Sequence, residues 1–194
     1  MIKVSGFLTG HLLLALPTEE ENEFTESVVF VCRHDEKGAM GFVINQTLEG
    51  VFLSDMLLSV EESIGRALPA YLETQSPILW GGPVDMHRGF ILHSLDYQQP
   101  HTIQIADHYG LTANIDVLHA ISSGESAPAH YSLLLGYAGW RSGQLEKEIE
   151  KYGWLSMPAT PELLFEVPHQ ERWKTALNQL SIDGRYLSKM KGHA

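Results

Sequence analysis

The chain has 194 residues, of which 44% are hydrophobic, and a formal net charge of −11 at pH 7. This length suits one domain with its own core, and the one cysteine, Cys32, excludes an internal disulfide bond. No apolar run approaches the roughly 18 residues that a membrane-spanning helix needs. No signal-peptide pattern follows Met1. We therefore predict a cytoplasmic protein that does not bind membranes.

The negative charge is concentrated in the first part of the chain. Residues 1–140 contain 5 Lys+Arg and 17 Asp+Glu, a balance of −12, whereas residues 141–194 contain 8 and 7, a balance of +1. Binding to nucleic acid depends on several Lys and Arg side chains placed against phosphates. The charge pattern therefore argues against direct contact with DNA or RNA.

Apolar runs predict strands early in the chain. Residues 8–17, 27–32 and 41–45 are rich in side chains that favour strands. A polar turn at residues 34–38 separates the second run from the third, so an antiparallel hairpin is expected. Alternating apolar residues predict a further, half-buried strand at 102–105.

Helical patterns occur in three places. Apolar side chains repeat at helical spacing over residues 53–60, and Ser59 with Glu62 has the form of a capping box for a second short helix. Asn114 is a good N-cap for a helix over 115–121. Near the C-terminus, an apolar stripe predicts a helix that packs on the core. The stripe consists of Trp173, Ala176, Leu177 and Leu180.

Two glycine-rich stretches dominate the middle of the chain. Residues 78–93 predict a strand, a Gly-Gly-Pro turn and a second strand, and residues 133–146 predict a strand, a glycine loop and a helix that starts near Gly143. Strand pairs that alternate with short helices favour an α+β (mixed α/β) fold. We expect a single domain over residues 1–182 and a loose polar tail over 183–194.

We predict that the two glycine loops lie together and form the functional cleft, because loops at the ends of strands converge in such sheets. Backbone N–H groups of glycine loops and helix N-termini attract anions, so the expected ligand is a small anion, with a protein partner as the other candidate. Close packing is the alternative explanation for the glycines. The candidate residues are Asn45, Gly81, Gly82, Arg88, His93, Tyr137, Gly139, Trp140, Gly143, Gln144 and Glu146.

Neither a metal nor a cofactor is predicted. The glycine stretches match neither of the standard phosphate-binding fingerprints. His11, His34 and His93 stand at strand ends, but their spacing matches no metal-ligand motif. Cys32 lies within an apolar strand, which indicates a small buried residue rather than a nucleophile.

The glycine-rich stretches belong to a larger set of motifs, at residues 8–17, 38–45, 81–84 with 88–93, 136–140 with 143–146, 154–155, 161–165 and 192–194. These combined motifs resemble the AlgH/YqgE family of bacterial proteins over nearly the whole chain. The resemblance implies a bacterial cytosolic protein with one α/β domain, whose sheet is strongly bent into a barrel-like form. Some members of that family are called transcriptional regulators of alginate production. One position departs from the family pattern: Arg33 precedes His34 where the family commonly has an acidic residue.

Two functions from different classes remain open. The first is a non-enzymatic regulatory or ligand-binding protein that acts indirectly on gene expression, since the motifs include no convincing nucleophile or metal triad. The second is an enzyme acting on a small anionic metabolite, with His93 or His34 as the base. Whether His93, Asn45, Arg88 and Glu146 open into one cleft discriminates between them.

Overall fold

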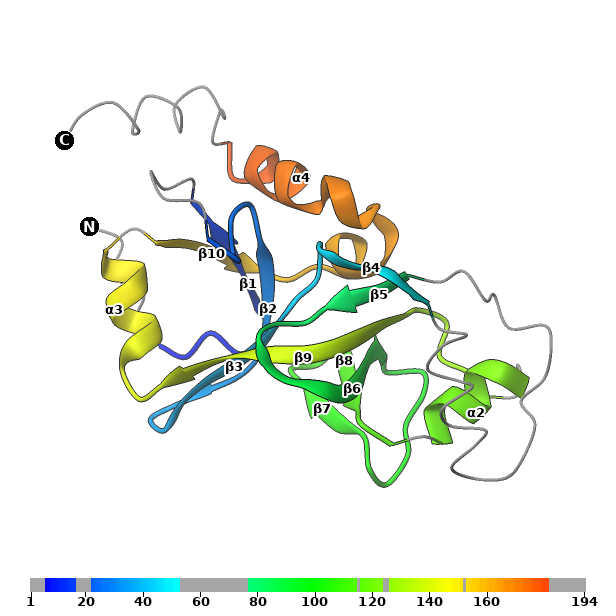
Figure 1. Ribbon diagram of the computed structural model, residues 1–194. Coiled ribbons are helices and arrows are strands. Elements are labelled where there is room, and N and C mark those ends of the chain that lie inside the picture. The colour runs from blue at the N-terminus through cyan, green and yellow to red at the C-terminus, as the bar shows by residue number, and fades with distance from the viewer. Residues whose placement is uncertain are drawn as a thin grey trace.

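The computed structural model describes residues 6–16, 22–52, 77–114, 116–123, 126–151 and 153–181. Within these ranges, ten strands form one sheet that curls into a half-barrel, with short helices around it (Figure 1). The strands are β1 (His11–Ala15), β2 (Val28–Asp35), β3 (Gly38–Val43), β4 (Thr47–Phe52), β5 (Pro77–Trp80), β6 (Val84–Ser94), β7 (Ile103–Ile105), β8 (Tyr109–Thr112), β9 (Tyr131–Arg141) and β10 (Trp154–Pro158). The helices are α2 (Asp116–Ser123), α3 (Gln144–Glu150), the π-helical turn η1 (Glu162–Glu166), the 3-10 turn η2 (His169–Glu171) and α4 (Arg172–Gln179).

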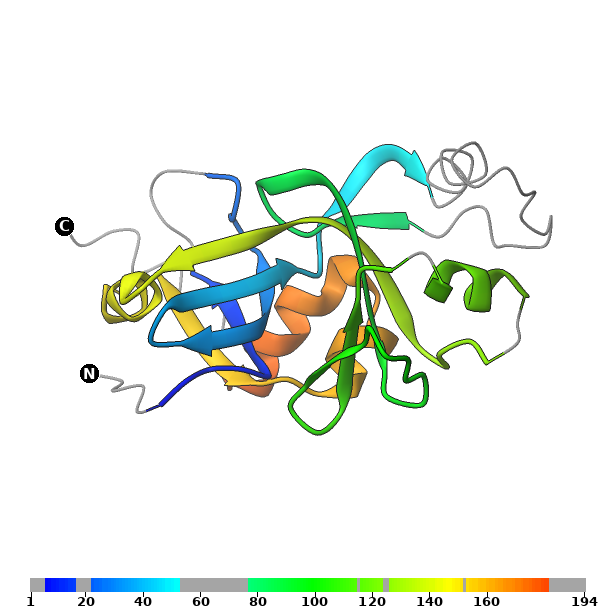
Figure 2. The same ribbon diagram turned by 90° about the horizontal axis from the view of Figure 1, so that it is seen from below.

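The main path of the sheet runs β10-β1-β2-β3-β9-β6-β8-β7, and β5 joins β9 while β4 pairs with β5. All pairings are antiparallel except that of β5 with β9, so the sheet is mixed. Seen from below, the sheet curls around α4, which is orange in Figure 2. The predicted α+β fold with a strongly bent, barrel-like sheet is therefore confirmed.

Both faces of the sheet are covered, which explains the continuous apolar runs of the first strands. In β1, Leu12 and Leu14 face the core that contains η1 and α4, whereas Leu13 faces the core beneath α3. All three side chains are fully buried. Because successive side chains of a strand point to opposite faces, only a sheet buried on both sides needs three leucines in a row.

The predicted hairpin is present, but its turn is shorter than expected. β2 and β3 pair antiparallel, and only Glu36 and Lys37 form the turn between them. His34 and Asp35 therefore belong to β2, and His34 is buried. The prediction of a turn over residues 34–38 was wrong at His34 and Asp35, and also at Gly38, which begins β3.

The Gly-Gly-Pro turn crosses directly over β9. The N–H of Gly81 donates to the Leu135 carbonyl at 2.8 Å. A Cβ on Gly82 would lie 2.3 Å from the Tyr137 carbonyl carbon, and one on Gly136 would lie 2.3 Å from the Gly82 carbonyl oxygen. These glycines therefore permit a backbone-to-backbone approach that no side chain would allow.

The second glycine stretch is not a loop. β9 continues through it to Arg141, and Gly139 pairs with Met40 of β3. Within β9, only Gly136 has a positive φ, at 69°. The chain turns at Ser142 and Gly143 and then enters α3.

The helices near 115 and 173 are present as α2 and α4. The Asn114 side chain accepts the N–H of Asp116 at 3.1 Å, as its capping role predicts. In α4, Ala176 and Leu177 are buried, and the Trp173 indole donates to the Ala15 carbonyl at 3.0 Å. No helix in the described part of the chain has both the length and the hydrophobicity needed to cross a bilayer.

Strands β4, β8 and β10 were not expected from the sequence. The predicted strand at residues 102–105 is present as β7, although Ile103 is 62% exposed. The predicted helices over residues 53–62 and the predicted tail lie outside the described residues.

Candidate functional site

A cleft of about 460 Å³ opens between the end of β9, the Gly-Gly-Pro turn and α3. Its walls are mainly apolar and aromatic, and one cation and two carboxylates lie among them. The described lining residues are Ala15, Leu16, Asn22, Glu23, Phe24, Thr25, Pro83, Val84, Ala138, Gly139, Trp140, Gln144, Glu148, Lys151, Gly153 and Trp154. We call this the aromatic cleft.

The Glu148 carboxylate organises the aromatic cleft. Its Oε2 accepts the indole N–H of Trp140 at 2.8 Å and that of Trp154 at 3.0 Å. Its Oε1 accepts the Gln144 side-chain amide at 2.9 Å. Hydrogen bonds to a charged acceptor are stronger than neutral ones, so this carboxylate fixes the orientation of both indole rings.

The rings form a continuous aromatic wall. Trp140 and Trp154 meet edge to face, with ring centroids 6.1 Å apart. Phe24 contacts Trp154 at 5.8 Å and Trp80 at 5.7 Å. Edge-to-face aromatic pairs are favourable beyond their buried area, so this wall is already in place without a ligand.

Three of the predicted site residues line the aromatic cleft: Gly139, Trp140 and Gln144. Gly81 and Gly82 hold the Gly-Gly-Pro turn against β9, next to the lining residues Pro83 and Val84. The two glycine stretches therefore lie together, as expected from the sequence. Whether the aromatic cleft is functional remains a prediction.

Other predicted site residues lie elsewhere. Tyr137 packs toward the opposite core, where its ring meets Phe90 at 6.2 Å. The Asn45 side chain bonds to the backbone at the start of β2: its Oδ1 accepts the Val28 N–H at 2.7 Å, and its Nδ2 donates to the Glu26 carbonyl at 2.8 Å.

Arg88 and His93 do not line the aromatic cleft, which corrects their predicted roles as anion clamp and base. The Arg88 guanidinium lies over the Phe90 ring, 5.1 Å from its centre. His93 is fully buried between β6 and β8, where its Nε2 is 2.9 Å from the Thr112 hydroxyl. Burial lowers the pKa of His93, so it stays neutral at neutral pH.

The start of α3 is also a weaker anion site than predicted. The helix has only seven residues, and Gly143 caps it with φ at 69° and no side-chain hydrogen bond. Glu146 stands in the first turn and already supplies negative charge there.

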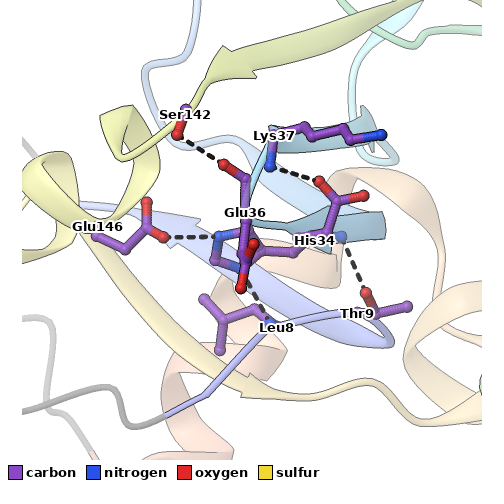
Figure 3. Close-up of polar contacts among 8 residues, drawn as sticks. Leu8, Thr9, His34, Glu36, Lys37, Ser142 and Glu146 are labelled. Carbon is purple, nitrogen blue, oxygen red and sulfur yellow. Dashed lines mark hydrogen bonds and ion pairs between the residues drawn. The ribbon is translucent and has the colours of Figure 1, made fainter.

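His34 forms an acid–histidine pair, but its partner comes from a distant part of the chain (Figure 3). Its Nδ1 accepts the Leu8 N–H at 3.0 Å, so Nε2 carries the proton and donates to Glu146 at 3.1 Å. The Thr9 hydroxyl accepts the His34 N–H at 2.9 Å. Glu146 thus supplies the acidic partner that Arg33 does not, and Arg33 itself is exposed, 3.6 Å from Asp35.

The remaining sequence candidates are also placed within the fold. The Cys32 thiol donates to the Met40 carbonyl at 3.2 Å, and burial raises its pKa to about 12. His11, His34 and His93 do not converge, and no group of three or more potential metal-ligating side chains occurs within the described ranges.

Comparison with known proteins agrees with this fold. A family model described as AlgH-like matches residues 12–185. The chain belongs to the AlgH-like family. A UPF0301 protein of Mesorhizobium japonicum is 43% identical over 192 residues, covering 97% of this chain and 94% of that protein. A UPF0301 protein of Bartonella tribocorum is 41% identical over 197 residues, covering all of both chains.

Solved structures show the same architecture as this AlgH-like protein. The solution structure of the AlgH protein from Pseudomonas aeruginosa superposes with a TM-score of 0.77, at 36% identity and full coverage of both chains. A crystal structure of a Corynebacterium diphtheriae protein gives a TM-score of 0.67, covering 92% of this chain and 90% of that one. At 20% identity, that second likeness shows the fold alone.

Sequence reasoning missed several residues of the aromatic cleft in this AlgH-like protein. Phe24 and Trp154 come from segments that only the sheet brings beside β9. Glu148 carried a usable signal, because it stands four residues after Gln144 and therefore on the same face of a helix. The helix follows directly after the strand that contains Trp140. The spacing could therefore have placed the Glu148 carboxylate next to that tryptophan.

Proposed function

We propose that this AlgH-like protein is a non-enzymatic, cytosolic ligand-binding protein, and that the aromatic cleft is its binding site. One observation carries the proposal. Glu148 holds two indole rings in fixed orientation at the wall of a cleft of about 460 Å³. A site whose aromatic groups are already positioned loses little conformational entropy when a ligand binds.

The lining favours a particular ligand chemistry. Its ionisable side chains are Glu23, Glu148 and Lys151, a formal balance of −1. An anion would be repelled, whereas a cation or hydrogen-bond donor on an aromatic or apolar body would find ring faces and a carboxylate. We therefore propose a cationic or donor-bearing aromatic ligand in place of the anion expected from the sequence.

Binding without catalysis is supported by how the candidate reactive groups are engaged. The His34 ring uses both nitrogens in hydrogen bonds, and its side chain is 1% exposed. His93 is likewise bonded through both nitrogens, and the Cys32 thiol is buried with a raised pKa. A general base must reach its substrate with a free lone pair, which these groups lack in this geometry.

A regulatory role would be indirect. With a balance of −12 over residues 1–140, the protein repels a nucleic-acid backbone. We propose that an occupied cleft alters contact with a protein partner, and that any effect on gene expression passes through that partner.

A thermal-shift screen with aromatic amines and other cationic metabolites tests the proposal. A ligand present at 100 times its dissociation constant should add about 2.7 kcal/mol to the unfolding free energy. Binding should also change the tryptophan fluorescence, since Trp140 and Trp154 line the cleft.

Two variants locate the binding. Val84→Trp should narrow the cleft and abolish the response to a hit, because Val84 lines it and is exposed. Ile103→Thr, on an exposed strand position far from the lining residues, is the matched control and should bind normally. Chemical conversion of the hit, seen by mass spectrometry, would favour an enzyme instead.

A further inference from the structure

A second pocket, of about 330 Å³, lies near the other end of β9. It is bounded by β5, the start of β9, η1, η2 and α4, and it shares no lining residue with the aromatic cleft. The polar lining residues used below are His130, Ser132, His169 and Arg172, and Phe165 forms one apolar wall. We call this the Arg172 pocket.

Arg172 is the unusual feature of the Arg172 pocket. This arginine is only 6% exposed. Its Nε donates to the Val167 carbonyl at 3.0 Å and its Nη1 to the Ile44 carbonyl at 2.5 Å. Both acceptors are neutral, and no described carboxylate lies within ion-pair distance.

A buried guanidinium without an anion is costly, because burial removes the charge from water. Burial lowers the pKa of Arg172 to about 10, with no nearby carboxylate acting to raise it. Arginine has five N–H donors in a planar fork that matches the geometry of an oxyanion. Two donors are used within the described residues, so the Nη2 side of the fork is available to the pocket.

Two histidines of the pocket lining, His130 and His169, add ring N–H groups that can donate to an anion. Burial, and then the charge of Arg172, lowers the pKa of His169. His130 is exposed at the rim, with its ring stacked on Phe165 at 5.8 Å and 21°. The Asp96 carboxylate bonds to Ala129 of the pocket lining, and its oxygens accept the Ser94 hydroxyl and the Ala129 N–H.

We propose that the Arg172 pocket binds the oxyanion group of a small metabolite, a carboxylate or a phosphate. The two N–H groups of Arg172 Nη2 donate to the oxyanion, and His169 and Ser132 donate to its remaining lone pairs. The volume leaves room for more than a bare inorganic ion. This anion site is separate from the cleft of the proposed function, because its lining on β9 ends at Leu133 and that of the cleft begins at Ala138. Five residues of strand span roughly 17 Å.

Titration of the labelled full-length protein with inorganic phosphate and, separately, with oxalate tests this site by NMR of the histidine rings. Sodium chloride at matched ionic strength is the salt control. We expect saturable shifts of His130 and His169 with at least one probe, and a higher pKa of His169 in its presence. The probe that binds more tightly decides between phosphate and carboxylate.

Three variants separate the site from general electrostatics. Arg172→Lys keeps the charge but loses the planar fork, so affinity should fall about tenfold or more. His169→Gln, at a partly exposed position, should weaken binding several-fold and serves if the lysine variant does not fold. Arg88→Lys changes an arginine outside the pocket and should bind as the parent protein does.

The proposal is overturned if neither probe gives a saturable shift, or if chloride reproduces the shifts. It is also overturned if Arg172→Lys and His169→Gln bind as tightly as the parent. Because the signals come from the two pocket histidines, a negative result does not bear on the binding function proposed for the aromatic cleft.

Discussion

At the scale of single residues, neighbouring glycines in this fold have different tasks. Gly82 has φ at 146°, and a Cβ there would lie 2.3 Å from the Tyr137 carbonyl carbon. Gly139 has ordinary strand geometry, and its Cβ would meet only the Tyr137 ring edge at 3.5 Å. Gly82 therefore fixes the crossing of two backbones, whereas a side chain at Gly139 would meet only the Tyr137 ring, on the face of β9 opposite Trp140.

This difference predicts unequal costs for the same substitution. Gly82→Ala should lower the unfolding free energy by about 3 kcal/mol or more, because it adds both strain and a backbone clash. Gly139→Ala should change it by less than about 1 kcal/mol. Urea denaturation of both variants measures this, and similar midpoints would contradict the packing role of Gly82.

At the scale of elements, α3 connects the parts of the site through two acidic side chains. Glu146 holds His34 and the hairpin on one side, and Glu148 holds Trp140 and Trp154 on the other. The Ser142 hydroxyl adds a bond to the Glu36 carbonyl at 2.6 Å, just before the helix begins (Figure 3). A seven-residue helix is too short to be stable alone, so these tertiary contacts keep it in place.

Glu148→Ala should therefore destabilise the protein by about 2–3 kcal/mol, because two indole donors and one amide lose a charged acceptor. Tryptophan fluorescence should change with it, since both rings lose their orientation. Glu150→Ala, at an exposed position of the same helix, is the control and should stay within about 0.5 kcal/mol. Equal urea midpoints for the two variants would show that Glu148 does not organise the cleft.

Helix α4 depends on Trp173, which is partly buried and bonded to β1 through the Ala15 carbonyl. Trp173→Ala should cost about 3 kcal/mol, the lower end of the range for removing a core aromatic. Trp173→Phe keeps most of the contact area and should cost about 1 kcal/mol for the lost hydrogen bond. Lys174→Ala, on the exposed face, is the control in the same denaturation series, and a loss equal to that of Trp173→Ala would contradict the docking of α4.

Local patterns predicted elements better than they predicted the site. The leucines of β1, the hairpin after Cys32 and the N-cap at Asn114 depend on neighbours in sequence, and all three are present. The aromatic cleft instead depends on Phe24 and Trp154, which are brought together only by the curl of the sheet. Arg88 was expected to bind an anion, yet the buried cation is Arg172. The apolar pattern of the helix that follows Arg172 predicts packing on the core and does not indicate a pocket.

At the scale of the whole molecule, buried histidines couple stability to pH. His93 is fully buried, with Gly110 of β8 directly against its ring, and burial lowers its pKa below the ordinary 6.5. Burial lowers the pKa of His169 as well. The hydrogen bond to the Ser94 carbonyl and the charge of Asp96 oppose the lowering of the His93 pKa, but burial outweighs both.

The sign of the effect follows from which state takes up protons first. Above pH 7 both states are neutral at His93, and as pH falls through 6.5 the unfolded chain is protonated before the folded one. Stability should therefore fall between pH 7.5 and 5.5, by up to about 1.4 kcal/mol per pH unit for each such histidine. His93→Gln should show a smaller fall in urea midpoint over this window than the parent, while His101→Gln, at an exposed position, should show the same fall. If the parent protein is as stable at pH 5.5 as at pH 7.5, His93 can be protonated while the protein stays folded. That result would contradict the effect expected from its burial between β6 and β8.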